Sequence, residues 1–484
     1  MAGPPGSGFL SPPFLPTPEP NGELGALALG DILTEIQGVC VAFDSATFDP
    51  SPVWHRLDNP TGPYTVTGYT ITRGRRYETD RTDTGRATIT MIDKTGALDP
   101  TNTLGPLYGK IIPRKQAAIA LQNPITGTWR TIYRGFVSAW RFQPHPTERW
   151  NEVTIELDDA LAVLAATEIV PDGSFGHQVQ SGNVVYNQDA NLAAAQTRIV
   201  KVLDEVGWPG AGPSDTLRDI FTGNVGLQQT TYSPRSAALN VLDDACDAEF
   251  PAGVSCRYVS KDGKITFRGR YTRFKFLDAS YGIDMWEAGD DAEAAADPTN
   301  VVPLVPPLLF YVDDSQMFTS ALATPQDVDD SAISAQYVTD SAAADAHGVR
   351  TWSAENLVTL GGEGPTTALA ETKLFAEYVV GNYSTPRLRV ETLCVIPRMP
   401  GHPSAAIAWE FACNVELNDV LDIHMSPAWS TGSTAGVGYD GNFRFFVEGI
   451  TYEVEPLNAT MPLVKLMIDV SPSGYFSSNP FADA

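Results

Sequence analysis

Two carboxylates, Asp93 and Asp99, flank Gly96 in the stretch DKTGALD, and this spacing could hold a metal ion. Thr95 could add a hydroxyl ligand, but the two residues after the glycine carry no side-chain oxygen. A calcium loop needs oxygen ligands at alternate positions and a distal Glu, so this set is too small for a cage. The stretch instead predicts a turn that Asp93 starts, with Gly96 at positive φ, and that Pro100 ends.

The histidines and acidic residues do not form a catalytic motif. The histidines lack the i,i+4 spacing of a zinc helix and none lies beside a Gly-x-Ser-x-Gly elbow. Neighbouring carboxylates on a strand face opposite ways, so the acidic pairs predict solvated surface. With no phosphate-binding glycine loop and no dinucleotide fingerprint, we expect no catalytic, cofactor-binding or metal-binding residue and no enzyme. The residues weighed are His55, His145, His177, His347, His402 and His424, and the pairs Asp158/Asp159, Asp243/Asp244 and Asp329/Asp330.

Five arginines gather in one short stretch of an otherwise acidic chain. A nucleic-acid patch would interleave aromatic residues, and only Tyr77 is present. Glu78, Asp80 and Asp83 offset much of the positive charge. The stretch therefore predicts ion pairing between strands or between subunits, with an exposed strand face as the alternative. The arginines are Arg73, Arg75, Arg76, Arg81 and Arg86.

Length and composition restrict the class of protein. The 484 residues suggest about three domains, and the 41 glycines and 37 prolines favour a turn-rich, mainly β chain. A net charge of −26 disfavours adhesion to nucleic acid, although an acidic wall would let DNA pass; solubility alone is the other explanation. No signal peptide or membrane span is expected. The five cysteines are scattered without CxxC spacing, which argues against disulfides and structural zinc and favours a reducing compartment.

The pattern along the chain predicts a mainly β fold with an α+β insertion. Its first β part reads as a run of hairpins that closes with a short helix from about Asp158. A mixed part follows, and then a second run of strands. The predicted divisions are an extended Pro/Gly-rich arm at 1–38, a first antiparallel β domain at 39–168, an inserted α+β domain at 169–310, a second β domain at 311–470 and a C-terminal tail at 471–484.

Particular elements follow from periodicity and end signals. We expect Asp189 to cap a helix that ends before Gly207, and Ser233 to cap a second helix with Pro234 at its first position. The acidic, Ala-rich stretch 288–302 predicts a solvated connector. The expected helices are 189–206, 234–249 and 366–380 (bounded by Pro365 and Gly381), with a hairpin over 254–270 and late strands at 387–396, 405–411, 420–425, 443–455 and 463–470.

A repeated sequence pattern, here called an internal echo, links the two β parts. From Gly135 and again from Gly449, the sequence gives a glycine, an alternating strand, a Pro-bearing turn and a second alternating strand. Any two antiparallel hairpins could match to this extent. The echo nevertheless suggests two similar β domains with a mixed domain inserted between them.

The order of four stretches resembles the central baseplate hub, or tail-associated minor tail protein, of long-tailed (siphovirus-type) bacteriophages, in the style of actinobacteriophages. Each stretch is loose, and their order is the specific feature. His347 stands where the family commonly has an aromatic residue, which leaves the subfamily open. The stretches are RGRRYETDRTDTGRATITMIDKTGALDPTN (73–102), YRGFVSAWRF to NEVTIELDDALAVLA (133–165), SAALNVLDDACDAEF to SCRYVSKDGKITFRGR (236–270), and DSAAADAHGVRTWS (340–353) with FFVEGITYEVEP (445–456).

This resemblance implies two tail-tube-like antiparallel β domains per chain. Three chains would then present six such domains in a trimeric hub ring at the tail tip, which joins a six-fold tail tube to a three-fold tip and lines the channel for DNA ejection. The implied partners are a distal tail ring, the tape measure protein and other minor tail or fibre proteins, with DNA passing through the lumen without specific binding. The implied location is the virion, after assembly in the host cytoplasm.

Two other classes stay open at this stage. A hexameric distal tail ring would need only one tube-like domain per chain. A receptor-binding tail-tip component would expose an aromatic-lined pocket, which we would look for in the inserted domain near Trp208 or Trp286. A cell-wall hydrolase is the enzymatic alternative, and no motif supports it.

Overall fold

The structure is a computed structural model of the chain. It describes residues 23–24, 37–58, 64–145, 147, 150–170, 178–215, 217–251, 253–362, 367–424, 444–456 and 462–476. Most of the predicted N-terminal arm and most of the tail after residue 471 lie outside the described residues.

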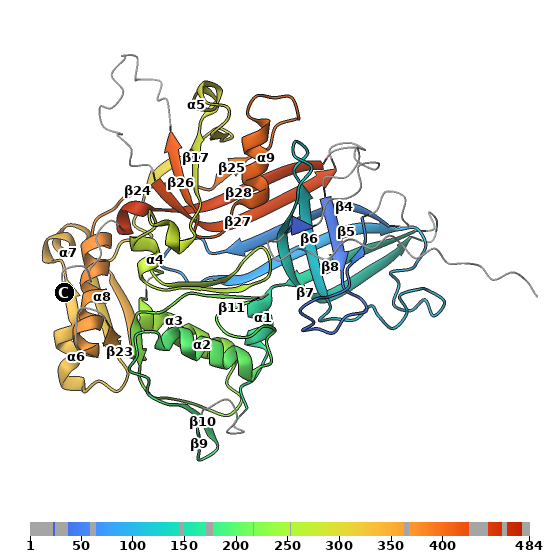
Figure 1. Cartoon of the computed structure of the whole chain (residues 1–484). Coiled ribbons are helices and arrows are strands. Elements are labelled where there is room, and N and C mark those ends of the chain that lie inside the picture. The colour runs from blue at the N-terminus through green and yellow to red at the C-terminus, as the bar shows by residue number, and fades with distance from the viewer. Residues whose placement is uncertain are drawn as a thin grey trace, which may run out of the picture.

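One large sheet joins the first third of the chain to the last. Its 14 strands among the described residues follow the order β18-β17-β26-β27-β4-β5-β8-β7-β6-β2-β3, while β28 pairs with β27 and β25, and β1 pairs with β7. Figure 1 shows the blue strands β4 and β5 beside the red β27 and β28. The strands are β1 (Glu23–Leu24), β2 (Gln37–Val41), β3 (His55–Arg56), β4 (Tyr64–Gly74), β5 (Asp83–Asp93), β6 (Gln116–Gln122), β7 (Trp129–His145), β8 (Trp150–Asp158), β17 (Met285–Gly289), β18 (Val301–Pro303), β25 (Leu393–Val395), β26 (Val420–His424), β27 (Arg444–Pro456) and β28 (Pro462–Pro472).

Alternation of side chains explains these strands. In β5, Ala87, Ile89 and Met91 are buried on one face, whereas Arg86 and Thr88 are exposed on the other. Antiparallel pairs β4–β5, β6–β7, β7–β8 and β27–β28 form the hairpins that the sequence predicts. The prediction of a mainly β, largely antiparallel fold with helices inserted is therefore confirmed. The division into two tube-like domains stays a prediction.

Helices and small sheets lie around the large sheet. In Figure 1 the green helices α1, α2 and α3 lie below it, and the orange helices α6, α7 and α8 lie at the opposite end from β6. The helices are α1 (Ala160–Ala165), α2 (Ala194–Glu205), α3 (Ala238–Glu249), α4 (Tyr271–Phe274), α5 (Asp291–Ala296), α6 (Asp330–Gln336), α7 (Ser341–His347), α8 (Ala368–Tyr383) and α9 (Ala405–Asn414), with 3-10 turns η2 (Ala279–Tyr281) and η3 (Ser473–Phe476).

Five smaller sheets complete the described strands. The hairpin of β15 and β16 confirms the prediction over 254–270, with Gly263 at φ 81° in its turn. The strands are β9 (Gln178–Gln180), β10 (Asn183–Tyr186), β11 (Ser214–Asp215), β12 (Arg218–Ile220), β13 (Val225–Leu227), β14 (Thr230–Tyr232), β15 (Cys256–Val259), β16 (Ile265–Arg268), β19 (Phe310–Val312), β20 (Ser320–Pro325), β21 (Tyr337–Thr339), β22 (Thr351–Leu357), β23 (Thr359–Gly362) and β24 (Leu388–Val390).

The predicted strand at 405–411 is wrong, because these residues begin helix α9. Ala405, Ala408, Trp409 and Ala412 are buried at helical spacing, and Trp409 Nε1 donates to the carbonyl of Arg398 at 2.9 Å. Periodicity cannot distinguish a strand from a helix in so short an apolar run, and packing of Trp409 and Phe411 in the core of the large sheet decides for the helix.

The predicted connector at 288–302 is also wrong. Strands β17 and β18 and helix α5 occupy it, and β17 pairs in parallel with both β18 and β26 of the large sheet. Ala288, Val301 and Val302 are buried there, so only the helix is a solvated acidic segment. Asp290 caps that helix, since its side chain accepts from the backbone N–H of Ala292 and of Glu293 at 3.0 Å.

Helix ends differ from the predictions by up to five residues. Helix α2 begins at Ala194 rather than at 189, and Asp189 instead accepts from the backbone of Asn191. Helix α3 begins at Ala238, so Ser233 and Pro234 precede it without capping it. The helix predicted at 366–380 is α8, which passes Gly381 and continues to Tyr383 because its C-terminal turn is buried. The short helix after Asp158 is confirmed as α1, with Asp159 as its N-cap.

Candidate functional site

The residues around the loop between β4 and β5 carry the arginine cluster. Arg73 is 3% exposed, and its Nη1 lies 2.7 Å from Glu416 Oε1. Arg75 is 7% exposed, and its Nε lies 2.7 Å from Glu448 Oε2. These partners are 343 and 373 residues distant in the sequence. The prediction of ion pairing is confirmed within the chain, and pairing between subunits stays a prediction.

The other arginines of the cluster lie nearer to solvent. Arg81 pairs with Asp247 at 2.5 Å, but its side chain is 64% exposed. The Nε of Arg86 is 3.8 Å from Asp158, with the arginine side chain 77% exposed. Arg76 lies over the ring of Tyr77, with its Cζ 5.3 Å from the ring centroid. The alternative of an exposed strand face therefore describes Arg86 on β5, whereas Arg81 is exposed in the loop before that strand.

Glu448 is the centre of the buried ionic network. It is 3% exposed on β27, and Arg75, Arg273 and Ser471 all donate to its carboxylate. Burial alone would raise the pKa of Glu448, but the guanidinium groups of Arg273 and Arg75 lower it to about 2. The carboxylate therefore stays ionised and links the β4–β5 loop to helix α4 and to the C-terminal hairpin.

A close backbone approach locks this loop against the inserted part of the chain. Gly253 has φ of 73°, and a Cβ built on it would lie 1.4 Å from the carbonyl oxygen of Glu78. Arg75 Nη2 also donates to the carbonyl of Gly253 at 3.2 Å. Only a glycine fits here, because both the backbone conformation and the space exclude a side chain.

Three further buried ion pairs join distant segments. Glu78 is fully buried and accepts both terminal nitrogens of Arg389 on β24, at 2.7 and 3.1 Å. Arg270 lies between Glu249 of α3 and Glu371 of α8, at 3.5 and 2.7 Å, and all three side chains have 0% exposure. Such pairs define which segments meet more than they add stability.

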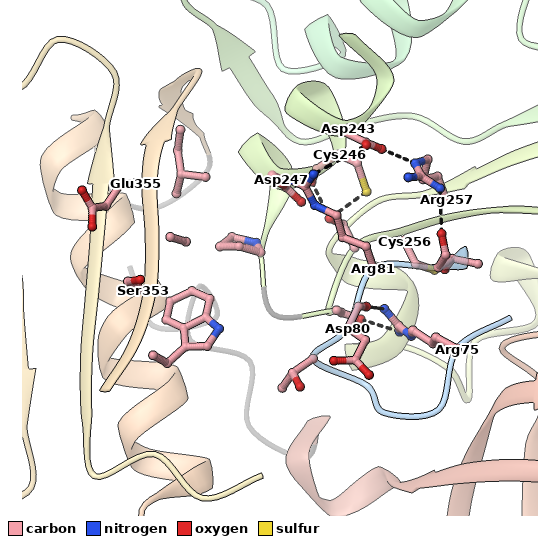
Figure 2. Close-up of a pocket in the computed structure, with 18 residues that line it drawn as sticks. Arg75, Asp80, Arg81, Asp243, Cys246, Asp247, Cys256, Arg257, Ser353 and Glu355 are labelled. Carbon is pink, nitrogen blue, oxygen red and sulfur yellow. Dashed lines mark hydrogen bonds and ion pairs between the residues drawn. The ribbon is translucent and has the colours of Figure 1, made fainter. Parts of the chain in front are cut away.

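Figure 2 shows a cavity of about 310 Å³ beside this network, with Ser353 and Glu355 on one wall and Arg81, Asp243 and Asp247 on the other. The guanidinium groups of Arg257 and Arg81 neutralise the two aspartates. Burial raises the pKa of the Cys246 thiol, which keeps it protonated and unreactive. This thiol is therefore not an activated nucleophile.

Three of the described histidines make structural contacts. His55 pairs with Asp44 at 2.8 Å, and His145 stacks on Trp150 with ring centroids 4.0 Å apart. His402 Nδ1 lies 3.0 Å from Ser404 Oγ, but this serine is 2% exposed and closed to a substrate. The remaining three are His347 and His424, both exposed, and His177, which lies outside the described residues.

The acidic pairs are mostly held by structural hydrogen bonds rather than solvated. Asp159 is buried, and its side chain accepts from the backbone of Gly85 and of Leu161. Asp243 pairs with Arg257, and Asp244 accepts from the hydroxyl of Tyr232 at 2.7 Å. The prediction of solvated surface is wrong for these residues, because local N–H and cationic donors replace water.

In the turn that Asp93 starts, the carboxylate binds backbone N–H groups rather than a metal ion. The side chain of Asp93 accepts from the backbone N–H of Thr95, Gly96 and Leu98, at 2.9, 3.0 and 2.8 Å. Gly96 has φ of 70°, as the turn requires. In the described part of the chain, no group of three or more His, Cys, Asp or Glu side chains could hold a metal ion.

The two tryptophans proposed for a receptor pocket are packed. Trp208 is 2% exposed, between Phe48 and Phe136. The Nε1 of Trp286 donates to Asp419 at 3.1 Å, and its ring meets Phe411 edge-on. Neither supplies an exposed aromatic platform.

Asp419 gives the folded chain a dependence on pH. It is 5% exposed, and burial raises its pKa to about 8 despite hydrogen bonds from Glu416 N and Trp286. Since an unfolded Asp has a pKa of about 3.9, the folded chain holds an extra proton from about pH 4 to about pH 8 and loses stability as pH rises through that window. We expect Asp419→Asn to remove up to about 1.4 kcal/mol of this loss per pH unit.

Urea unfolding of wild type and Asp419→Asn at a series of pH values in that window would check this expectation. The two stability profiles should diverge as pH rises. Parallel profiles would show that the Asp419 carboxyl does not hold the extra proton.

Sequence reasoning missed Glu448, Arg273, Arg270, Glu371 and Arg389, which form most of the network. One signal was available, because Glu448 interrupts the apolar run FFVEGI on a strand otherwise read as core. A charge at an inward position of a buried strand requires a buried partner. The partner itself could not be read from the sequence.

Solved structures of several tail and secretion-system proteins are similar to this chain at low sequence identity. No protein-family model and no curated protein matches the chain. It is similar to the tail protein from Neisseria meningitidis MC58 (10% identity, 92% of this chain, 99% of that chain, TM-score 0.48) and to a 43 kDa tail protein of prophage MuSo2 from Shewanella oneidensis (13%, 91%, 99%, 0.47). It is also similar to an E. coli component of the type VI secretion system (9%, 85%, 74%, 0.40). At these identities the likeness carries no argument about function.

No helix in the described part of the chain is both long enough and apolar enough to cross a membrane.

Proposed function

We propose that the chain is a structural virion protein of a bacteriophage tail tip. Three copies form a hub ring that joins the six-fold tail tube to the three-fold tip, and the ring lines the channel through which DNA is ejected. The ordered stretches that resemble the hub family, which together span residues 60–470, suggest this role, and the repeated hairpin pattern that begins at Gly135 and at Gly449 supports it.

The observation that carries the proposal is the likeness of two hairpins, β7–β8 and β27–β28. Each has a register shift close to its glycine, between Val137 and Ala139 in one and between Val447 and Gly449 in the other. A Cβ on Gly135 would lie 2.6 Å from the carbonyl oxygen of Asp158, and one on Gly449 would lie 2.7 Å from that of Arg75. Both hairpins therefore share a bulge and a glycine in close backbone contact, which agrees with two copies of one domain type, although the β4–β5 hairpin has the same feature at Gly74.

The sheet also suits closure into a ring. Strand β27 of the late part pairs with β4 of the early part, so both parts already belong to one sheet within a chain. The strand path ends at β18 on one side and at β3 on the other. Neighbouring copies could pair with or cover the end strands, of which the half-buried β3 is more accessible than the buried β18.

The charge of the chain agrees with a passive channel. A net charge of −26 would let DNA slide past without adhesion. The described histidines, cysteines and acidic pairs are largely bound in structural contacts, which supports a role that is not enzymatic. Under this proposal the neighbours are a distal tail ring, the tape measure protein and minor tail or fibre proteins, and assembly takes place in the host cytoplasm.

The number of copies per assembly tests the proposal. Native mass spectrometry of the purified chain, together with a three-dimensional image of intact particles, should give three copies on the tail axis. Six copies would instead indicate a distal ring, and a stable monomer off the axis would indicate a receptor-binding or enzymatic component.

A further inference from the structure

A second cavity, of about 360 Å³, lies in the inserted part of the chain. Helix α2 contributes Gln196, and the segment after β12 contributes Phe221 and Thr222. Tyr271 of α4 and Tyr281 of η2 complete its aromatic lining. Its volume falls in the range of about 300–1,000 Å³ that is typical of small-molecule sites.

The chemistry of this lining is unusual for the chain. Charged residues make up 19% of the sequence, but no lining residue of this cavity is charged. Three aromatic rings, two of them tyrosines, two side-chain amides and three serine or threonine residues surround the space. The cavity beside Arg81 is the contrast, since four carboxylates and three guanidinium groups line it.

Cations outside the cavity hold two of the rings in place. The Cζ of Arg268 lies 3.8 Å from the ring centroid of Phe221, and the Nζ of Lys275 lies 4.6 Å from that of Tyr271. Neither cation lines the cavity. Such contacts fix the rings before a ligand arrives, which lowers the entropy lost on binding.

The polar groups are similarly positioned. Gln196 Nε2 donates to the carbonyl of Ile220 at 3.1 Å, which fixes this amide at the wall. The backbone N–H of Asn224 donates to the buried carboxylate of Glu249, which anchors the segment that bears the second amide. Thr222 and Ser280 are exposed at the rim.

We infer that this cavity binds a neutral saccharide unit. Aromatic faces pack against the C–H faces of a sugar ring, and amides and hydroxyls meet its hydroxyl groups. Phosphate, sulfate or carboxylate ligands would need a cation in the lining, which this cavity lacks. The inference concerns a binding site and does not depend on the assembly role proposed above. It places the aromatic pocket sought near Trp208 or Trp286 at Phe221, Tyr271 and Tyr281 instead.

Binding to the full chain can be measured by saturation-transfer difference NMR. The probes are neutral trisaccharides of glucose, galactose, mannose and arabinose, with trisaccharides that contain glucuronic acid as the charged set. We expect saturable binding of at least one neutral trisaccharide and none of the charged set. Failure of every neutral probe to bind, or equal binding of the charged set, would overturn the inference.

Two variants locate the site. Ser280→Trp should place an indole over the cavity mouth and weaken binding at least about tenfold, which corresponds to about 1.4 kcal/mol. Ser341→Trp makes the same change at an exposed position of α7, outside the cavity, and should leave binding unchanged. Thr222→Val, which keeps the side-chain shape but removes a rim hydroxyl, should also weaken binding and does not introduce a large ring. Equal affinity in all three folded variants would place the saccharide elsewhere and overturn the inference.

Discussion

Glu448→Ala is expected to lower the free energy of unfolding by about 3–5 kcal/mol, because it removes the anion that neutralises two buried guanidinium groups. Arg75 and Arg273 would remain with side-chain exposures of 5% and 2%, in a site that closes around them. A buried charge without a counter-charge costs far more than the lost pair contributes. Chemical denaturation followed by circular dichroism would measure the loss.

Glu453→Ala is the matched control on the same strand. Glu453 pairs with Lys465 at 2.9 Å, but the side chains are 42% and 39% exposed. An exposed pair of this kind contributes about 0–1 kcal/mol. In the contrary outcome, both variants lose the same small amount of unfolding free energy. The network around Glu448 would then be a solvated surface feature, and the junction would have to be held by apolar packing alone.

Local features of the molecule were predictable from the sequence, since the residues that decide them lie close together. The turn at Asp93 needs only a carboxylate and a glycine within a few positions, and both the turn and the positive φ of Gly96 are present. The hairpins of the first β part follow from alternation and turn residues in the same way.

Elements that depend on distant packing were not predictable. The residues from Ala405 to Phe411 form a helix because the large sheet offers them a covered site, where Trp409 is 1% exposed. Strand β17 exists because β26, more than a hundred residues later, pairs with it. Propensity and periodicity are weak where tertiary contacts decide, as in both these cases.

The distinction between local features and distant contacts also explains why the ionic network could be predicted only in part. The arginines were visible as a cluster, but their carboxylates lie in four different segments, at Glu416, Glu448, Asp247 and Asp158. No local rule gives a pairing over 373 residues. What the network does follows from its position: it ties the β4–β5 loop to the inserted part and to the last hairpin, so these parts hold one fixed arrangement. A hub that carries load between a tail tube and a tip would need that arrangement to stay fixed.

Gly253→Ala is expected to have the largest effect of any single methyl addition in this junction. The added Cβ would lie 1.4 Å from the carbonyl oxygen of Glu78 and 2.9 Å from Arg75 Nη1. The clash involves backbone, so no side-chain rotation relieves it. The β4–β5 loop and the segment after α3 would have to separate, and the loss in unfolding free energy should exceed about 4 kcal/mol.

Gly212→Ala is the control variant, because it introduces the same backbone strain without the clash. Gly212 has the same φ of 73° as Gly253, but a Cβ on it would meet nothing within 4 Å. Its substitution should therefore cost only the left-handed conformation of alanine, about 1–2 kcal/mol. Thermal and urea unfolding of the two variants would give the difference directly. A large difference means that the loop and the inserted part interlock through backbone contact. Equal losses would mean that the two segments move apart at little cost, and the close approach at Gly253 would then have no part in holding the junction.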